Sequence, residues 1–194
     1  MDQALEVTLT VAGALEKLGV AYLLGGSLAS SLHGIPRATQ DADLVADLRV
    51  EHIAPLIAEL GSAFYADDQA MRKAVRQARS FNLIHLGSMF KVDVFVAGDD
   101  PLVREELARA GRLPLPNLPG RSIMVASPED VVIQKLVWYR KGGEISERQW
   151  RDVLGVLRIQ AGTLDAGYLA SSAGRAGVAD LLERARQEAG AAGR

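Results

Sequence analysis

The sequence predicts an α+β fold, in which strands and helices alternate in a first part and only helices follow, with the division near residue 127. Apolar runs of strand length occur only in the first part, at residues 20–24, 41–46, 82–86, 90–96 and 122–126. In the second part, apolar residues recur at helical spacing instead. A chain of 194 residues with 48% hydrophobic and 24% charged residues is typical of one folded domain with an appendage.

The first helix is predicted at residues 2–18, because Val7, Val11 and Leu15 recur at helical spacing and Gly19 can end the segment. Ser27 follows the first strand and can cap a short helix. Up to residue 80, the predicted elements are a helix at 2–18, a strand at 20–24, a helix at 28–32, a strand at 41–46, and helices at 50–60 and 69–79.

The middle of the chain predicts a β-hairpin, because Gly87-Ser88 separates two apolar runs. Prolines mark residues 113–120 as a linker. After the hairpin strands, the predicted elements are a helix at 101–110, a strand at 122–126, helices at 128–141 and 146–160, and two weaker helices toward the C-terminus.

Composition excludes several classes of protein. The absence of cysteine rules out disulfides, thiol catalysis, iron–sulfur clusters and cysteine-based zinc sites, and the 3 histidines are not spaced as a ligand set. A net charge of −2 argues against binding nucleic acid through bulk positive charge. The first residues lack a basic signal-peptide region and no apolar run has the length of a membrane span. We therefore expect a soluble, cytoplasmic protein with no membrane partner.

Two aspartates lie on the strand predicted at residues 41–46. Side chains alternate along a strand, so Asp41 and Asp43 point to one face while Ala42 and Leu44 point to the other. Neighbouring carboxylates repel each other, and a hard divalent cation such as Mg²⁺, which prefers oxygen ligands, would compensate their charge. The alternative is an edge strand with a solvated acidic face.

A third aspartate, Asp93, lies in the middle of the strand at 90–96, on the face opposite Val92 and Val94. Together with Asp41 and Asp43 it makes a set of strand carboxylates that can converge and hold two Mg²⁺ ions for phosphoryl or nucleotidyl transfer. Taken alone, Asp93 could simply pair with Lys91.

The segment Gly25-Gly26-Ser27 joins the first strand to a short helix. Its glycines allow a sharp turn and the close approach of a phosphate, and the N–H groups that open the helix would face that anion. Many strand–helix turns contain such a tripeptide for steric reasons alone.

One lysine, Lys135, falls inside the apolar arc of the helix at 128–141, which the pair Ser127-Pro128 can start. An inward lysine needs an anionic partner, because an unpaired buried charge is costly. Lys135 would therefore hold a nucleotide phosphate, or it would snorkel from the edge of the arc or form a structural pair with Asp152.

Further cations lie before the acids and in the helix at 69–79. In the loop before Asp41, Arg37 and Thr39 could contact triphosphate oxygens or cap the loop. In the helix, Arg72, Arg76 and Arg79 are spaced to line one ridge, which would follow an RNA backbone or form a solvated face.

These residues together resemble the polymerase-β-type nucleotidyltransferase superfamily. The resemblance rests on Gly25-Gly26-Ser27, then Arg37-x-Thr39-x-Asp41-x-Asp43, then Asp93 on a later strand. Within that superfamily, His33-Gly34-x-Pro36-Arg37-x-Thr39, Lys135-Leu136 and Arg151-Asp152 are similar to the AbiEii-like nucleotidyltransferases, which include toxins of type IV toxin–antitoxin systems. The chain is short for the full toxin architecture.

The resemblance implies a mixed β-sheet of about 4–5 strands packed on helices, with a nucleotidyltransferase core at 1–126 and a helical part at 127–194 that completes the active-site cleft. It also implies site residues. The catalytic residues would be Asp41, Asp43, Asp93 and Lys135, the three aspartates would hold two Mg²⁺ (or Mn²⁺) ions, and the nucleotide would be bound by Gly25, Gly26, Ser27, Arg37, Thr39, Lys135 and Asp152.

The function expected from these residues is a Mg²⁺-dependent transfer of NMP from an NTP to a hydroxyl, with release of pyrophosphate. The acceptor would be RNA or tRNA, a protein or a small molecule, and a cognate antitoxin is an expected partner. Two other functions remain open at this point, a non-catalytic nucleotide-binding or interaction module on the same fold and an antibiotic-modifying nucleotidyltransferase.

Overall fold

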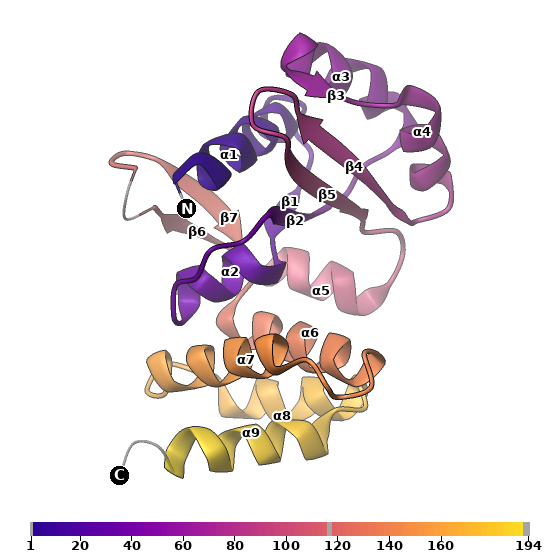
Figure 1. Ribbon diagram of the computed structural model, residues 1–194. Helices are drawn as coiled ribbons and strands as arrows, with labels where there is room; N and C mark the ends of the chain where they lie inside the picture. The colour runs from indigo at the N-terminus through magenta and orange to yellow at the C-terminus, as the bar shows by residue number, and fades with distance from the viewer. Residues whose placement is uncertain (1, 116–117, 192–194) are drawn as a thin grey trace. The chain divides into compact units, whose positions relative to one another are not determined.

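The structure, a computed structural model, describes residues 2–115 and 118–191 (Figure 1). The chain forms two compact units. The first comprises the chain up to Gly25 together with Ala38–Ala126, and the second comprises Gly26–Arg37 together with the chain from Ser127 onwards. The functional division predicted at residues 126 and 127 stays a prediction, but helix α2 (Gly26–His33) packs with the second unit although it precedes most of the strands.

The first unit is built on a mixed sheet with the strand order β3-β4-β5-β2-β1-β7-β6. The pairs β1–β7 and β2–β5 are parallel and the other neighbours are antiparallel. The strands are β1 (Tyr22–Leu24), β2 (Asp41–Ala46), β3 (Phe64–Tyr65), β4 (Ser80–His85), β5 (Phe90–Val96), β6 (Gly111–Pro114) and β7 (Ser122–Val125).

The sheet has 7 strands in the described residues, so the expected 4–5 is wrong. The two additional strands, β3 and β6, form the edges. Strand β3 is only 2 residues long, and β6 includes Gly111 and Pro114, which are tolerated at a sheet edge but suggest a loop in sequence. Strand β6 also overlaps the predicted linker at 113–120, of which positions 116–117 lie outside the described residues.

The helices of the first unit are α1 (Asp2–Lys17), α3 (Ile53–Leu60), α4 (Asp68–Arg76) and α5 (Pro101–Arg109), with single turns of 3₁₀-helix at η1 (Val50–His52) and η2 (Gly61–Ala63). Aspartates start two of them, because Asp67 and Asp100 accept hydrogen bonds from backbone N–H groups of the first turn. Helix α1 packs against α3, β2 and β5. Strand β2 buries Ala42, Leu44 and Ala46, which leaves its alternate residues on the opposite face.

The second unit is entirely helical in its described residues. It comprises α2 and the helices α6 (Pro128–Lys141), α7 (Glu147–Ile159), α8 (Ala166–Arg175) and α9 (Ala179–Ala191) (Figure 1). The predicted start of α6 is confirmed, since Ser127 caps the helix by accepting from the N–H of Asp130. No helix among the described residues combines the length and hydropathy needed to cross a membrane.

Helix α2 approaches α7 so closely that glycine is required where the helix ends. A Cβ on Gly34 would lie 2.8 Å from the backbone nitrogen of Val156 and 2.9 Å from the carbonyl carbon of Gly155. Backbone atoms cannot move aside as the end of a side chain can, so any larger residue would push the two helices apart. This close packing fixes the position of the loop that carries Arg37.

Candidate active site

Three aspartates share one face of the sheet in the first unit. Residues Asp43 and Asp93 lie opposite each other on the parallel strands β2 and β5, and Asp41 lies opposite Lys91 in the adjacent row. All four residues are half-buried, because the side chains between them in sequence point into the core. We call Asp41, Asp43 and Asp93 the carboxylate face.

The next strand extends these two rows. Antiparallel pairing places Asn82 of β4 opposite Asp93, and Ile84 opposite Lys91. Asn82 therefore adds an amide oxygen to the row of Asp43 and Asp93. The sequence pattern did not single out Asn82, because strand order and register depend on long-range pairing that local spacing does not contain.

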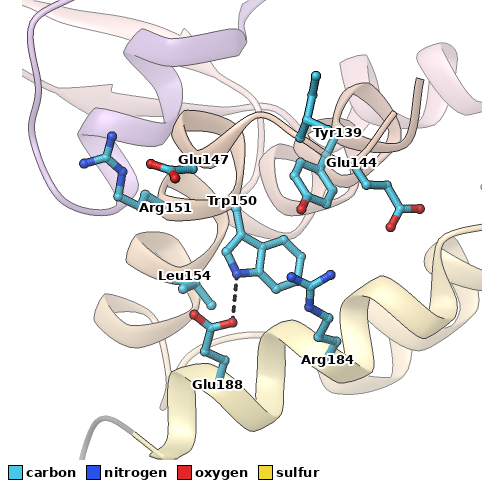
Figure 2. A pocket seen from close by; sticks show the side chains of 9 residues that line it. Tyr139, Glu144, Glu147, Trp150, Arg151, Leu154, Arg184 and Glu188 are labelled. Atoms are coloured by element: carbon cyan, nitrogen blue, oxygen red, sulfur yellow. Dashed lines mark hydrogen bonds between the residues drawn. The ribbon is translucent and has the colours of Figure 1, made fainter. Parts of the chain in front are cut away.

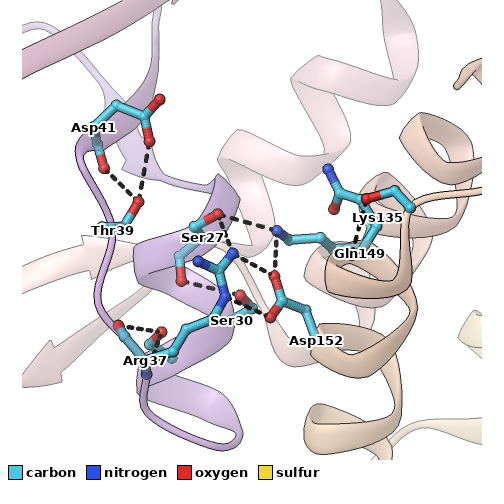
Figure 3. Close-up of polar contacts among 10 residues, drawn as sticks. Ser27, Ser30, Arg37, Thr39, Asp41, Lys135, Gln149 and Asp152 are labelled. Carbon is cyan, nitrogen blue, oxygen red and sulfur yellow. Dashed lines mark hydrogen bonds and ion pairs between the residues drawn. The ribbon is translucent and has the colours of Figure 1, made fainter.

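Asp93 and Asp41 each contact a side chain within the unit. The Lys91 ammonium lies 2.7 Å from an oxygen of Asp93. The hydroxyl of Thr39 donates to Oδ1 of Asp41 at 3.0 Å (Figure 3). The pairing of Asp93 with Lys91 is the simple alternative that its place in the strand allowed. For Thr39, the contact is with Asp41 itself, so any contact with a triphosphate stays a prediction.

The donor set of the carboxylate face suits Mg²⁺, which binds carboxylate and amide oxygens. As the side chains lie, however, no group of three or more His, Asp or Glu side chains among the described residues is close enough together to hold a metal ion. A physical reason is visible, because Lys91 holds Asp93 and Thr39 holds Asp41. Metal binding at this face therefore requires the aspartate side chains to move from their present positions.

A second group of polar residues lies within the second unit. Here Asp152 of α7 accepts two hydrogen bonds from Arg37, at Nε and Nη2, and one from Lys135 of α6, each 2.8 Å long (Figure 3). Ser27 of α2 accepts from Nη2 of Arg37 at 2.6 Å and from Lys135 at 3.4 Å. We call Ser27, Arg37, Lys135 and Asp152 the Asp152 cluster. It unites four of the residues predicted to bind a nucleotide.

The electrostatics of this cluster are dominated by burial and pairing. Burial raises the pKa of Asp152, but the hydrogen bonds from Arg37 and Lys135 lower it by more, so that its pKa lies below the ordinary value of an aspartate. Lys135 faces inward, as the helical spacing predicts, and is almost completely buried. The cluster thus places two cations beside one carboxylate.

The turn that starts α2 has the backbone geometry that the glycines allow. Gly26 has a φ of 57°, in the left-handed region, and Ser27 follows it in the first turn of the helix. In the first unit, the N–H of Gly25 donates to the carbonyl of Asp43 at 2.8 Å. Gly25 is therefore fixed by the same strand that carries two of the carboxylates.

The sequence pattern missed Gln149, which lies one turn before Asp152 on α7 and is drawn beside Lys135 in Figure 3. Its amide oxygen is buried, and no donor among the described residues bonds to it. A spacing of three residues places it on the face of α7 that carries Asp152, which is the signal that could have identified it.

The arginine ridge predicted in the helix at 69–79 does not form as expected. Helix α4 ends at Arg76, and Ala78 with a φ of 47° turns the chain, so Arg79 lies outside the helix. Arg72 bonds to Asp68 one turn earlier and is not a free cation. The predicted alignment of Arg72, Arg76 and Arg79 on one helical ridge is therefore wrong.

A pocket of about 300 Å³ lies within the second unit, between α6, α7 and α9 (Figure 2). Its lining includes Tyr139 and Trp150, and the guanidinium of Arg184 lies 4.2 Å from the centre of the Trp150 ring. The indole N–H of Trp150 donates to Glu188 at 2.8 Å. None of the predicted site residues lines this pocket.

Comparison with solved structures identifies the fold. The chain is similar to an antigenic nucleotidyltransferase-like protein from Paracoccidioides brasiliensis, with a TM-score of 0.53 and 18% identity over 95% of this chain and 93% of that one. It is also similar to the lincosamide antibiotic adenylyltransferase LnuA (TM-score 0.52, 15% identity, 82% and 98% coverage). A third similar structure is ANT(2")-Ia in complex with adenylyl-2"-tobramycin (TM-score 0.52, 15% identity, 91% and 97% coverage).

No family model matches the sequence, and no curated protein matches it. At these identities the solved structures show the fold alone, and that fold is nucleotidyltransferase-like. The expected fold is therefore supported, whereas membership of the superfamily and of an AbiEii-like subfamily stays a prediction.

Proposed function

We propose that this protein is a Mg²⁺-dependent nucleotidyltransferase, which transfers NMP from an NTP to an acceptor hydroxyl and releases pyrophosphate. The observation that carries the proposal is the placement of Asp43 opposite Asp93 on the parallel strands β2 and β5, with Asp41 on the same face. Three carboxylates with one lysine on the same face of a sheet carry excess negative charge, which a divalent cation would compensate, and the fold is nucleotidyltransferase-like.

In this proposal, Asp41, Asp43 and Asp93 hold the metal ions, with Asn82 beside them in the same row as Asp43. When bound, two Mg²⁺ ions would neutralise phosphate charge and make the acceptor hydroxyl more acidic. The carboxylate of Asp93 favours loss of the acceptor proton as the hydroxyl oxygen bonds to the α-phosphorus. The bond from that phosphorus to the bridging oxygen then breaks, and the electron pair leaves with pyrophosphate.

The Asp152 cluster supplies the anion-binding groups. Arg37 and Lys135 carry the positive charge. Ser27 offers its hydroxyl to phosphate oxygens, and the turn at Gly25-Gly26 aims the N–H groups that open α2 toward them, while the N–H of Gly25 itself bonds to Asp43. Asp152 bonds to both cations and so holds them in position before any ligand arrives. Thr39, which bonds to Asp41, is the remaining predicted contact for the triphosphate.

Replacement of Asp43 tests the function. Asp43→Asn removes one negative charge from the carboxylate face and keeps the side chain's size, so we expect transfer from labelled NTP to fall by at least about 100-fold. The matched control is Asp99→Asn, which removes a fully exposed carboxylate from the same unit. Retention of transfer by Asp43→Asn at the rate of the control would contradict the site assignment.

The acceptor can be sought in the same assay. Two of the similar structures are antibiotic adenylyltransferases, described with lincomycin and with adenylyl-2"-tobramycin, which favours a small antibiotic as the acceptor. The motif resemblance to AbiEii-like toxins favours RNA, tRNA or protein and a cognate antitoxin. Incubation of each labelled NTP with lincosamides, aminoglycosides and total tRNA separates these acceptors. A protein that binds NTP without any Mg²⁺ dependence and modifies none of them would be a non-catalytic nucleotide-binding module.

A further inference from the structure

The carboxylate face contains its own cation, which the proposed reaction does not use. Strand β5 places Lys91 two residues before Asp93, so both side chains point to the same side of the sheet. The Lys91 ammonium lies 2.7 Å from an Asp93 oxygen, and the strand register places Lys91 opposite Asp41.

The electrostatic environment of this ammonium is set by the three aspartates. The ammonium lies 2.7 Å from an Asp93 oxygen, Asp41 is its partner in the strand register, and Asp43 is the register partner of Asp93 on the same face. One positive charge on this face therefore partly compensates three negative charges. Lys91 balances part of the charge that a divalent cation would balance.

A divalent cation and this ammonium compete for the same carboxylate. The ammonium lies 2.7 Å from one Asp93 oxygen, so a metal ion bound to this carboxylate would lie close to the ammonium and be repelled by it. Lys91 is nevertheless able to leave. Its side chain is 40% exposed, so the ammonium can rotate into water with little loss of burial.

We propose that Lys91 is a tethered counterion, which holds the carboxylate face in its metal-free state and is displaced when a divalent cation binds. This inference rests on the proposed function, because it takes the carboxylate face as the metal site. Lys91 is thus a positioning residue that sets the affinity for the metal.

The test is the affinity of the whole protein for Mn²⁺, measured by titration calorimetry without nucleotide. The variant Lys91→Met keeps the length of the side chain but removes the competing charge, so the Kd for Mn²⁺ should fall by about fivefold, the upper range for an exposed ion pair. Lys91→Arg retains a cation that binds carboxylate through two N–H groups, so the Kd should stay equal or rise. The matched control, Lys73→Met, removes an exposed lysine from α4 in the same unit and should leave the Kd unchanged.

The outcomes separate this inference from the proposed function. If Asp43→Asn abolishes Mn²⁺ binding while Lys91→Met and Lys73→Met both bind as the wild type does, the counterion role is wrong and the metal site stands. If Asp43→Asn binds Mn²⁺ with unchanged affinity, the metal site itself is wrong. Circular dichroism checks that each variant is folded. If Lys91→Met does not fold, the inference is tested by Lys91→Arg alone, which preserves the charge. A lower Kd for Lys91→Arg than for the wild type would overturn it.

Discussion

The two units contain the same kind of ion pair in very different surroundings. Lys91 and Asp93 lie 2.7 Å apart on the sheet, with 40% and 15% of their side chains exposed. Lys135 and Asp152 lie 2.8 Å apart in the helical unit, with 5% and 6% exposed. The two distances are nearly equal. Water can reach the first pair and take the place of either partner, whereas the second pair is almost completely buried.

Two ion pairs of nearly equal length can therefore differ in how readily they exchange partners and in how much they stabilise the fold. An exposed pair contributes about 0–1 kcal/mol and exchanges its partners readily. Removing one member of a buried pair leaves a charge without compensation and costs about 3–5 kcal/mol. The carboxylate face is therefore suited to exchange a cation, whereas the Asp152 cluster is suited to hold its groups in fixed positions.

The largest expected effect is that of removing Asp152. Asp152→Ala leaves Arg37 and Lys135 facing each other in a buried site, so the free energy of unfolding should fall by about 3–5 kcal/mol. Asp93→Ala breaks an exposed ion pair but also relieves repulsion on the carboxylate face, so it should change the free energy of unfolding by less than about 1 kcal/mol. Denaturation in urea measures both, and equal losses would show that burial does not distinguish the two pairs.

The packing that surrounds the buried pair can be tested next. Gly34→Ala forces a Cβ against backbone atoms of α7, so we expect a loss of about 1–3 kcal/mol in the free energy of unfolding. The control is Gly13→Ala in α1 of the other unit, where no atom lies within 4 Å of the added Cβ. A helical alanine should there add about 0.5–1 kcal/mol. A tolerated Gly34→Ala would contradict the tight contact between α2 and α7.

The stabilisation that Asp152 provides should depend on pH. Its pKa is lower in the folded than in the unfolded protein, so the stability it contributes is fully present above the unfolded value, about 3.9 for an aspartate, and is lost as the pH falls through the folded pKa. We expect the stability difference between the wild type and Asp152→Asn to be constant near neutral pH and to shrink below about pH 4. Urea denaturation across a pH series measures it, and a difference that grows in acid would have the wrong sign.

The smallest expected effect is that of Lys91 on stability. Lys91→Met should change the free energy of unfolding of the metal-free protein by less than about 1 kcal/mol, because the pair is exposed. The change should diminish further in high salt, which screens surface charges. A loss as large as that of Lys135→Met would mean that Lys91 is a structural residue and not an exchangeable one.

Local patterns in the sequence predicted much of this structure. Alternation along β2 and β5 placed Asp41, Asp43 and Asp93 away from the core, and helical spacing placed Lys135 inside, because both depend only on neighbours in the chain. The serine before α6 was also read correctly as a cap. Their roles as metal ligands and nucleotide contacts stay predictions.

The rest depends on pairing between distant segments. Edge strand β6 overlaps the predicted linker because its glycine and proline are turn residues, and only its pairing with β7 makes it a strand. Asn82 joins the row of Asp93 through the register of β4, which nothing in its own sequence fixes. The displaced Arg79 follows from a left-handed Ala78, a conformation that alanine rarely adopts.

The placement of α2 has a consequence for any attempt to divide the gene. The chain passes between the units at Gly25–Gly26, at Arg37–Ala38 and at Ala126–Ser127. A fragment cut after Ala126 would keep α2 but lose α6 and α7, exposing Leu28 and Ala29, which are buried in the full chain. The complementary fragment would lack the helix that covers α6 and α7. The two units are therefore compact in space but not separable as two consecutive stretches of sequence, so neither half can be shuffled between proteins as an independent module.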